Sequence, residues 1–146
     1  MVKEQSGELF TQLTLEIFKL SGMLSNEGDQ LTKEFGLTSS RWKILGALDM
    51  SQAPLTVPQI GRAMGQSRQA VQRLVDVMAK DGLVDLVDNP NHKRAKYVAV
   101  TPKGDRIREQ LYEKWVPKAE QHASGFTLEE LKTALSVMQR ISQDLM

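Results

Sequence analysis

Residues 56–82 read TVPQIGRAMGQSRQAVQRLVDVMAKDG and carry the signals of two short helices separated by a tight turn. Thr56 and Gln59 match a capping box at the start of the first helix. Gly65 supplies the turn, and Ser67 is the expected N-cap of the second helix. The apolar residues that recur at helical spacing along this second helix, and that must form its buried face, are Val71, Leu74, Val75 and Met78.

Two short runs of β-branched residues follow, at 83–87 and 97–100, and a segment rich in turn formers separates them. This pattern predicts a β-hairpin. Before the two helices, residues 38–40 offer an N-cap for a further helix, which residues 52–54 break. The order helix, helix, tight turn, helix and hairpin is that of a winged helix-turn-helix. We therefore expect an α+β protein that is mainly α with a small β-hairpin wing.

Apolar residues recur at spacings of three and four, or of seven where a polar residue such as Glu27 takes one place, at both ends of the chain, as in helices that pack against a partner helix. The N-terminal stripe is Phe10, Leu13, Ile17, Leu20, Leu24 and Leu31, and the C-terminal stripe is Leu128, Leu131, Leu135, Met138 and Leu145. A monomer would expose both stripes, so they predict a homodimer. We expect residues 1–36 and 102–146 to form a helical dimerisation region and residues 37–101 to form the winged helix-turn-helix domain. Pro117 should kink or interrupt the fifth helix.

The charge is distributed unevenly along the chain, although the net charge is only +1. Residues 41–104 contain ten Lys or Arg and five acids, whereas acids outnumber bases on both sides. Scatter explains this asymmetry about as well as function does. More specifically, no acid occurs at 50–75 or at 89–104. Because phosphate repels carboxylates, two acid-free basic stretches in the helix and the hairpin indicate a surface that meets nucleic acid.

The polar face of the second helix has the chemistry that base reading needs. Arginine pairs with guanine and glutamine pairs with adenine in the major groove, and the free N–H groups at a helix N-terminus bind phosphate. The predicted DNA contacts are Ser67, Arg68, Gln69, Gln72 and Arg73 on the helix and Lys93, Arg94 and Lys96 on the hairpin. A merely solvated helix face is the alternative, and the adjoining hairpin and acid-free stretches favour DNA.

The spacing of these segments resembles that of the MarR family of transcriptional regulators. The matching stretches are Leu37-Thr38, Arg41–Leu45, Pro54–Gly65, Ser67–Asp76, Asp81–Val84, Lys93-Arg94 and Val100–Gly104. The resemblance implies a homodimer with interdigitating terminal helices, which places two recognition helices in successive major grooves of a pseudo-palindromic operator in double-stranded DNA. It also implies that binding near a promoter blocks or, less often, recruits polymerase, and that a small aromatic or lipophilic effector releases the DNA.

The resemblance assigns two further features of this chain. Arg94 matches the wing arginine that enters the minor groove, but His92 stands where the family carries an aspartate that braces the wing. The wing is therefore expected to be looser or to be braced differently. Trp42, Tyr112 and Trp115 are candidates for an effector pocket between the two regions, although core packing explains the same residues.

The sequence lacks the motifs that would indicate an enzyme, a metal or cofactor site, or a membrane protein. The chain has no cysteine, its two histidines lie far apart in sequence, and it contains no Gly-rich phosphate loop or nucleophile motif. We therefore expect no enzyme, no catalytic residue, no metal and no cofactor. The absence of a secretion signal and of a long apolar run predicts a cytoplasmic protein without membrane contact. The competing hypothesis is a protein-interaction adaptor built on a winged-helix scaffold.

Overall fold

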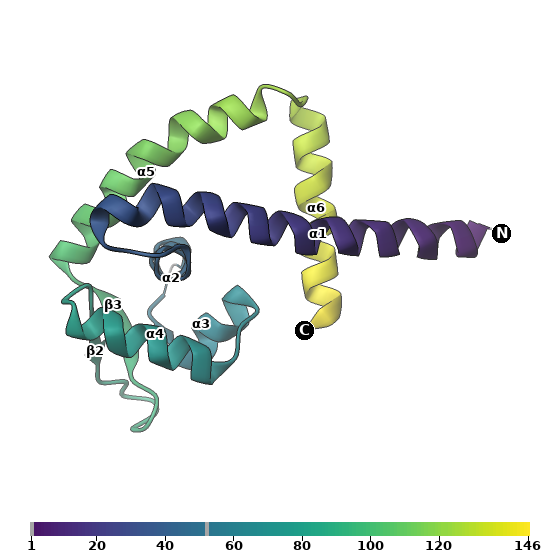
Figure 1. Cartoon of the computed structure of the whole chain (residues 1–146). Helices are drawn as coiled ribbons and strands as arrows, with labels where there is room; N and C mark the ends of the chain where they lie inside the picture. The colour runs from purple at the N-terminus through teal and green to yellow at the C-terminus, as the bar shows by residue number, and fades with distance from the viewer. Residues whose placement is uncertain (1, 52) are drawn as a thin grey trace. The chain divides into compact units, whose positions relative to one another are not determined.

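The computed structural model describes residues 2–51 and 53–146, so residue 52 of the expected helix break lies outside the described residues. The chain divides into two compact units, which meet between Leu111 and Tyr112. The first unit holds all three strands and the second is helical. Figure 1 shows the elements in chain order.

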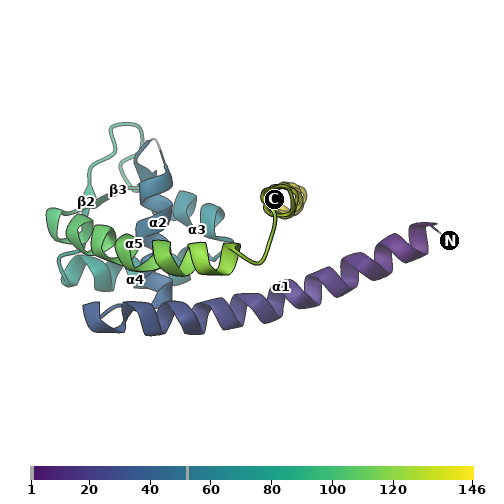
Figure 2. The ribbon, with the colours of Figure 1, turned by 90° about the horizontal axis from the view of Figure 1, so that it is seen from above.

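Helix α1 (Val2–Thr32) is long and continuous, and the glycines within it do not break it. A 3₁₀ turn (Lys33–Phe35) follows, and Gly36 then ends the helical segment with a left-handed conformation of φ 68°. Glycine adopts this conformation without the steric penalty that a Cβ would bring. Figure 2 shows that the N-terminal half of α1 extends beyond the other helices of the first unit.

The C-terminal end of α1 is fixed against the start of the next helix. Thr32 is fully buried, and its hydroxyl donates to the carbonyl oxygens of Gly28 at 2.8 Å and of Leu37 at 3.1 Å. The carboxylate of Asp29 accepts a hydrogen bond of 2.8 Å from the backbone N–H of Ser39. These bonds satisfy buried backbone groups at the junction and so hold α1 in one position.

Three short helices form the centre of the first unit, namely α2 (Ser39–Met50), α3 (Val57–Met64) and α4 (Arg68–Lys80). Each begins at a hydroxyl cap of the predicted kind, which is Thr38 for α2, Thr56 for α3 and Ser67 for α4. The capping box between Thr56 and Gln59 has both of its hydrogen bonds. The caps provide acceptors for N–H groups that the first turn of a helix leaves free.

An apolar core lies among these helices and the sheet. Its fully buried members on the helices include Ile44, Leu45, Ile60, Val71, Val75 and Met78, all with 0 % exposure. Three of the four apolar positions predicted for α4 are therefore completely buried, and the fourth, Leu74, is half-buried. Helix α4 packs on α3 and β2, so the opposite face of α4 remains in water.

The sheet has three antiparallel strands in the order β1-β3-β2, one strand more than the sequence predicts. The hairpin strands β2 (Val84–Val87) and β3 (Tyr97–Val100) are the expected ones. The additional strand β1 (Leu55–Thr56) pairs Leu55 with Val98. A strand of two residues has no readable alternation, and its partner lies far away in sequence, so only the tertiary structure defines it.

The chain enters helix α5 (Pro102–Ala123) directly from the hairpin. The hydroxyl of Thr101 donates to the carbonyl oxygen of Gly82 at 2.6 Å and accepts from the N–H of Gly104 at 3.1 Å. Gly104 is buried and passes so close to Leu83 that an added Cβ would collide with the Leu83 carbonyl oxygen. The end of α4, the start of β2 and the start of α5 are thus packed together.

The second unit contains the C-terminal half of α5 and helix α6 (Leu128–Leu145). Pro117 lies inside α5 without ending it, so of the two predicted effects, a kink or an interruption, the interruption is wrong. The missing N–H of proline removes one hydrogen bond, and the turns on either side continue the helix. A capping box between Thr127 and Glu130 starts α6. The Thr127 backbone N–H and hydroxyl hold the pKa of Glu130 below its usual value.

Both terminal stripes are largely solvent-exposed within one chain. On α1 the exposed members include Phe10, Leu20 and Leu24, whereas Leu31 is buried at the junction with α2. All five stripe residues of α6 are exposed. None of the described helices is long and apolar enough to span a membrane.

We predict that Gly104→Ala destabilises the fold by about 1–3 kcal/mol, the usual cost of inserting a methyl group into a packed site. The new Cβ would collide with the Leu83 carbonyl oxygen and lie 2.8 Å from Cγ1 of Val100. The midpoint of urea unfolding measures the effect. Gly46→Ala is the control, because nothing lies within 4 Å of its Cβ position and it is mid-helix. That change should leave stability equal or raise it by up to about 1 kcal/mol. Equal destabilisation by both changes would contradict the packing argument.

Candidate nucleic-acid interface

Helix α4 presents the predicted polar residues on its open face. Arg68, Gln69, Gln72 and Arg73 are all exposed, while Val71 on the opposite face is fully buried. The N-cap Ser67 is exposed too, and its hydroxyl accepts from the N–H of Ala70 at 3.1 Å. The helix thus directs two guanidinium groups, two amides and the positive end of its dipole toward solvent.

One side chain of this face has a partner that the sequence did not reveal. The amide nitrogen of Gln72 donates to a carboxylate oxygen of Asp76, one turn later on α4, at 2.8 Å. Both residues are exposed. Gln72 therefore has a hydrogen-bond partner on its own helix.

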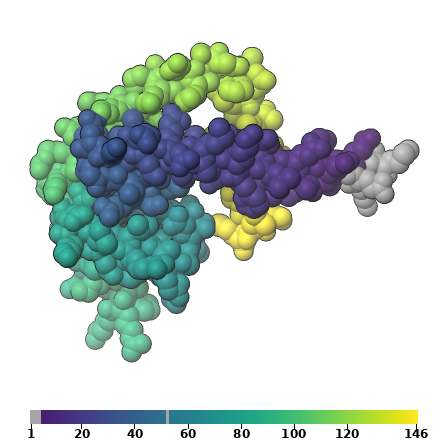
Figure 3. All heavy atoms as spheres, in the orientation of Figure 1, coloured from purple at the N-terminus to yellow at the C-terminus, as the bar shows by residue number. Residues whose placement is uncertain are grey.

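The wing is the turn between β2 and β3, and it protrudes from the first unit in Figure 3. Asn89 braces it from inside. Its side-chain amide donates to the carbonyl oxygen of Ala95 at 3.1 Å across the turn, and its side-chain oxygen accepts from the N–H of Asn91 at 2.9 Å. The backbone N–H of His92 also donates to the carbonyl oxygen of Asn89 at 3.1 Å. These hydrogen bonds brace the wing without the aspartate that the family carries at the position of His92. Of the two expectations, a looser wing or a different brace, they support the second.

The cations of the wing differ in how free they are. Lys93 and Arg94 are exposed at the tip. Lys96 is exposed as well, but its ammonium lies 4.0 Å from the carboxylate of Asp88. Asp88 immediately precedes the acid-free stretch 89–104. The base of the wing therefore carries one carboxylate although the stretch itself contains none. An exposed pair at this distance is weak.

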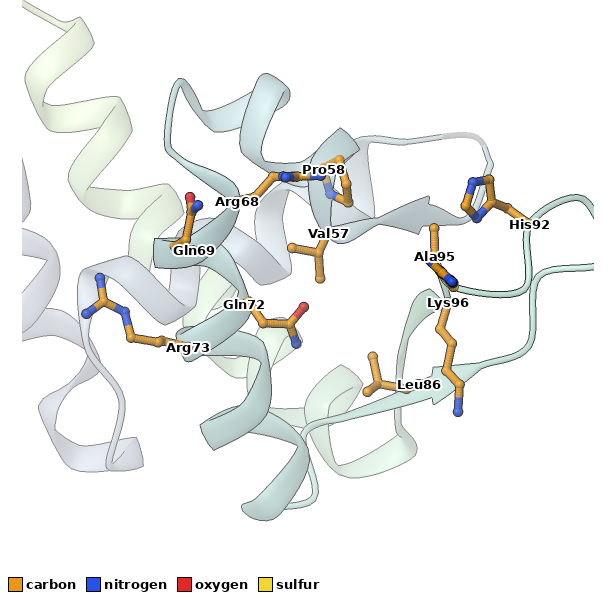
Figure 4. A pocket seen from close by; sticks show the side chains of 11 residues that line it. Val57, Pro58, Arg68, Gln69, Gln72, Arg73, Leu86, His92, Ala95 and Lys96 are labelled. Atoms are coloured by element: carbon orange, nitrogen blue, oxygen red, sulfur yellow. The ribbon is translucent and has the colours of Figure 1, made fainter.

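Helix α4 and the wing enclose an open hollow of about 790 Å³. Figure 4 shows side chains from α4 on one side and from the wing on the other. The hollow brings together His92 and six of the predicted DNA contacts. These six are Arg68, Gln69, Gln72, Arg73, Arg94 and Lys96. Ser67 and Lys93 are not among its lining residues. Apart from these two, the DNA contacts predicted from the sequence gather at one place.

The apolar lining of the hollow was not predicted. It consists of Val57, Pro58, Leu86 and Ala95. Leu86 belongs to one of the two runs that predict the hairpin, and it shows 42 % exposure. Such a run predicts a strand but does not indicate which of its residues line a hollow beside another element. Apolar groups at such a place suit contacts with the methyl group of thymine.

Ion pairs connect the helices around this site. Arg108 of α5 contacts Asp49 of α2 at 2.6 Å and Asp105 at 2.9 Å. The hydrogen bond to Asp105 and the charge of Asp49 raise the pKa of Arg108, against the opposing effect of its burial. Arg41 of α2 lies 3.6 Å from Asp81, the residue that ends α4. Both α2 and α5 are therefore attached to elements that position α4.

The three candidate effector residues belong to different units. Trp42 is half-buried in the first unit, whereas Tyr112 is exposed and Trp115 is half-buried in the second. None of the three lines the hollow beside α4. Within residues 2–51 and 53–146, no cluster of three or more His, Asp or Glu side chains is arranged to hold a metal ion.

Comparison with known proteins places this geometry in a family. The sequence model of a protein family, described as "MarR family", matches residues 35–95 of this chain. These residues span the helices α2 to α4 and most of the wing. An uncharacterised protein of Mycobacterium tuberculosis is 33% identical over 103 residues, covering 70% of this chain and 71% of that protein. The transcriptional activatory protein BadR of Rhodopseudomonas palustris is 29% identical over 106 residues, covering 71% and 61%. The multiple antibiotic resistance protein MarR of Salmonella typhimurium is 22% identical over 145 residues, covering 94% and 98%.

Solved structures agree on the fold. The Staphylococcus aureus MepR–DNA complex has a TM-score of 0.78 at 18% identity and covers 92% of this chain and 98% of that chain. CouR of Rhodococcus jostii RHA1, bound to p-coumaroyl-CoA, has a TM-score of 0.79 at 18% identity and covers 89% and 91%. The fold, the spacing of the helices and the sequence matches all agree, and the chain belongs to the MarR family of winged-helix transcriptional regulators.

Proposed function

We propose that the protein regulates transcription by binding a specific sequence in double-stranded DNA as a homodimer. The observation that carries this proposal is the hollow in which base-reading side chains of α4 face the cations of the wing. A helix of this width fits the major groove, and a basic turn beside it reaches the neighbouring minor groove. The similarly folded MepR was solved as a complex with DNA, which supports DNA binding as the function of this fold here.

In this proposal each predicted contact has a role. Arg68, Gln69, Gln72 and Arg73 meet base edges or nearby phosphates, and Ser67 offers the helix N-terminus to a phosphate. Lys93 and Lys96 meet phosphates, and the weak, exposed pair of Lys96 with Asp88 leaves its ammonium available for this contact. Arg94 enters the minor groove.

The exposed apolar stripes of α1 and α6 support the dimer. Residues 1–36 and 102–146 form the dimerisation region in this proposal, and residues 37–101 form the DNA-binding domain. Two copies of α4 related by a two-fold axis fit a pseudo-palindromic operator, because half-sites one helical turn apart face the same side of DNA.

We also propose that the protein represses transcription and that a small aromatic or lipophilic effector releases it from DNA. CouR, which shares the fold, binds an aromatic thioester. A ligand seated beside Trp42, Tyr112 or Trp115 can act only by binding the DNA-free state more tightly. The activator BadR shows that a relative works in the opposite direction. Promoter activity with and without the protein tests the direction, and operator affinity with and without aromatic acids tests release.

For the dimer, we expect a sedimentation mass of twice 16.4 kDa at micromolar concentration. Leu135→Glu should shift the protein toward the monomer, because a carboxylate would be buried in the apolar stripe of α6. Ser136→Glu is the matched control, since Ser136 is exposed on another face of the same helix. A wild-type protein that sediments as a monomer at moderate salt would remove the dimer from the proposal.

For α4, we first expect the wild-type protein to select a defined sequence from random duplexes. Arg73→Ala or Gln72→Ala should then lower affinity for that sequence by about 1–3 kcal/mol, the value of a good base contact. Folding should not change, because both side chains are exposed. Arg106→Ala removes the same charge from α5 outside the hollow and should lose less. Selection of no sequence, or full affinity in both α4 variants and their double mutant, would count against α4 as the reading element.

For the wing, Lys93→Ala and Arg94→Ala should have different effects. If Lys93 meets a phosphate, its loss weakens binding about equally on every sequence and reduces the salt slope by about one unit. If Arg94 enters the minor groove, its loss costs more on operators with A·T-rich flanks, whose narrow groove attracts arginine. Binding titrations at several salt concentrations on both kinds of flank measure the difference. Identical behaviour of the two variants would refute the division of roles.

A further inference from the structure

Helix α4 carries a carboxylate on a surface that is otherwise basic. Asp76 is the one acid between residues 50 and 80, and it is exposed. A carboxylate near DNA phosphates is unfavourable, because charges of like sign repel. Its position one turn after Gln72 is therefore informative.

The hydrogen bond between these residues fixes the orientation of the Gln72 amide. An ionised carboxylate only accepts hydrogen bonds, so it can face the nitrogen end of an amide but not the oxygen end. The amide nitrogen of Gln72 lies 2.8 Å from an Asp76 carboxylate oxygen. Figure 4 shows the Gln72 side chain pointing from α4 into the space between α4 and the wing. Its carbonyl oxygen is therefore the free end of the amide in this space.

We infer that Asp76 is a positioning residue for base recognition, which holds Gln72 so that its carbonyl oxygen faces the DNA bases. The inference rests on the proposed function. In the major groove, adenine and cytosine present an amino group at the position where thymine and guanine present a carbonyl oxygen. An amide fixed with its oxygen outward accepts from the amino group and is repelled by the carbonyl oxygen.

An unheld glutamine would not make this distinction. Its amide can rotate by half a turn and offer either a donor or an acceptor, so it adapts to all four base pairs. Holding the amide before DNA arrives also removes part of the entropy cost of ordering the side chain on binding. A pair of exposed side chains four residues apart adds little to helix stability, so a purely structural role explains the unfavourable carboxylate less well.

The test is selection from random duplexes by the full-length protein at moderate salt, compared among wild type, Gln72→Ala, Asp76→Asn and Asp76→Ala. The wild type should favour adenine or cytosine over guanine and thymine by about tenfold at one base pair in each half-site, as expected for one good contact. Gln72→Ala should lose this preference. Both Asp76 variants should relax the same base pair to about threefold or less while they keep the other selected positions.

Two controls separate positioning from charge and from folding. Asp85→Asn removes one negative charge from β2, outside the lining of the hollow, and should change affinity for all sequences without altering the base preference. Asp76 is exposed, so both of its variants should unfold at the wild-type temperature. Asp76→Asn keeps the shape of the side chain, and Asp76→Ala removes the side chain beyond Cβ. If both variants lose the same base preference, the loss does not come from a new contact made by the introduced asparagine.

The outcomes distinguish the inference from the proposed function. If the wild type selects no sequence, the proposed function fails and the inference fails with it. If Gln72→Ala loses its base pair but both Asp76 variants retain the full preference there, the proposed function stands and the inference is overturned. A change at a base pair other than the one lost in Gln72→Ala would overturn it as well.

Discussion

Burial of Val71, Val75 and Met78 on one side of α4 sets the position of every polar side chain on its other side. These residues have no exposure, and each contributes about 1.5–3 kcal/mol by leaving water. A rotation of α4 about its axis would expose some of them, so the helix has one stable orientation. That orientation explains why the polar side chains are exposed, since a helix that buries one face must present the opposite face to solvent. The exposed side chains are Arg68, Gln69, Gln72 and Arg73.

The two ends of α4 complete this constraint. At the N-terminal end, Gly65 adopts a left-handed conformation of φ 65°, and Ser67 caps the first turn. At the C-terminal end, the ammonium of Lys103 donates to the carbonyl oxygen of Asp81 at 2.8 Å, and the guanidinium of Arg41 lies beside the Asp81 carboxylate. Cations at this end interact favourably with the helix dipole. Because Arg41 belongs to α2 and Lys103 to α5, a displacement of either helix acts on α4 directly.

The charges of the site are arranged so that acids serve geometry while bases face the ligand. Asp88 lies beside Lys96 at the base of the wing, and Asp76 holds Gln72. In contrast, Arg94 at the wing tip and Arg73 on α4 are exposed on the hollow without a carboxylate partner among the described residues. The amide of Asn89 gives the wing internal order without adding charge. Under the proposed function, such an arrangement lets the basic surface be ordered before DNA binds.

The sequence by itself determined the local elements, because their signals are local. The caps at Thr38, Thr56 and Ser67, the turn at Gly65 and the buried face of α4 each depend on residues within one or two turns. The family spacing and the acid-free stretches then predicted which residues meet DNA, and this remains a prediction.

Only the tertiary structure decided the features that join distant segments. Strand β1 exists because Leu55 meets Val98, and the apolar lining of the hollow forms because α3, β2 and the wing each contribute residues to it beside α4. The wing brace depends on the turn bringing Asn89 next to Ala95. Pro117 remains inside α5 although a local rule places a break there. Such outcomes depend on packing and pairing in three dimensions, which spacing along a chain does not encode.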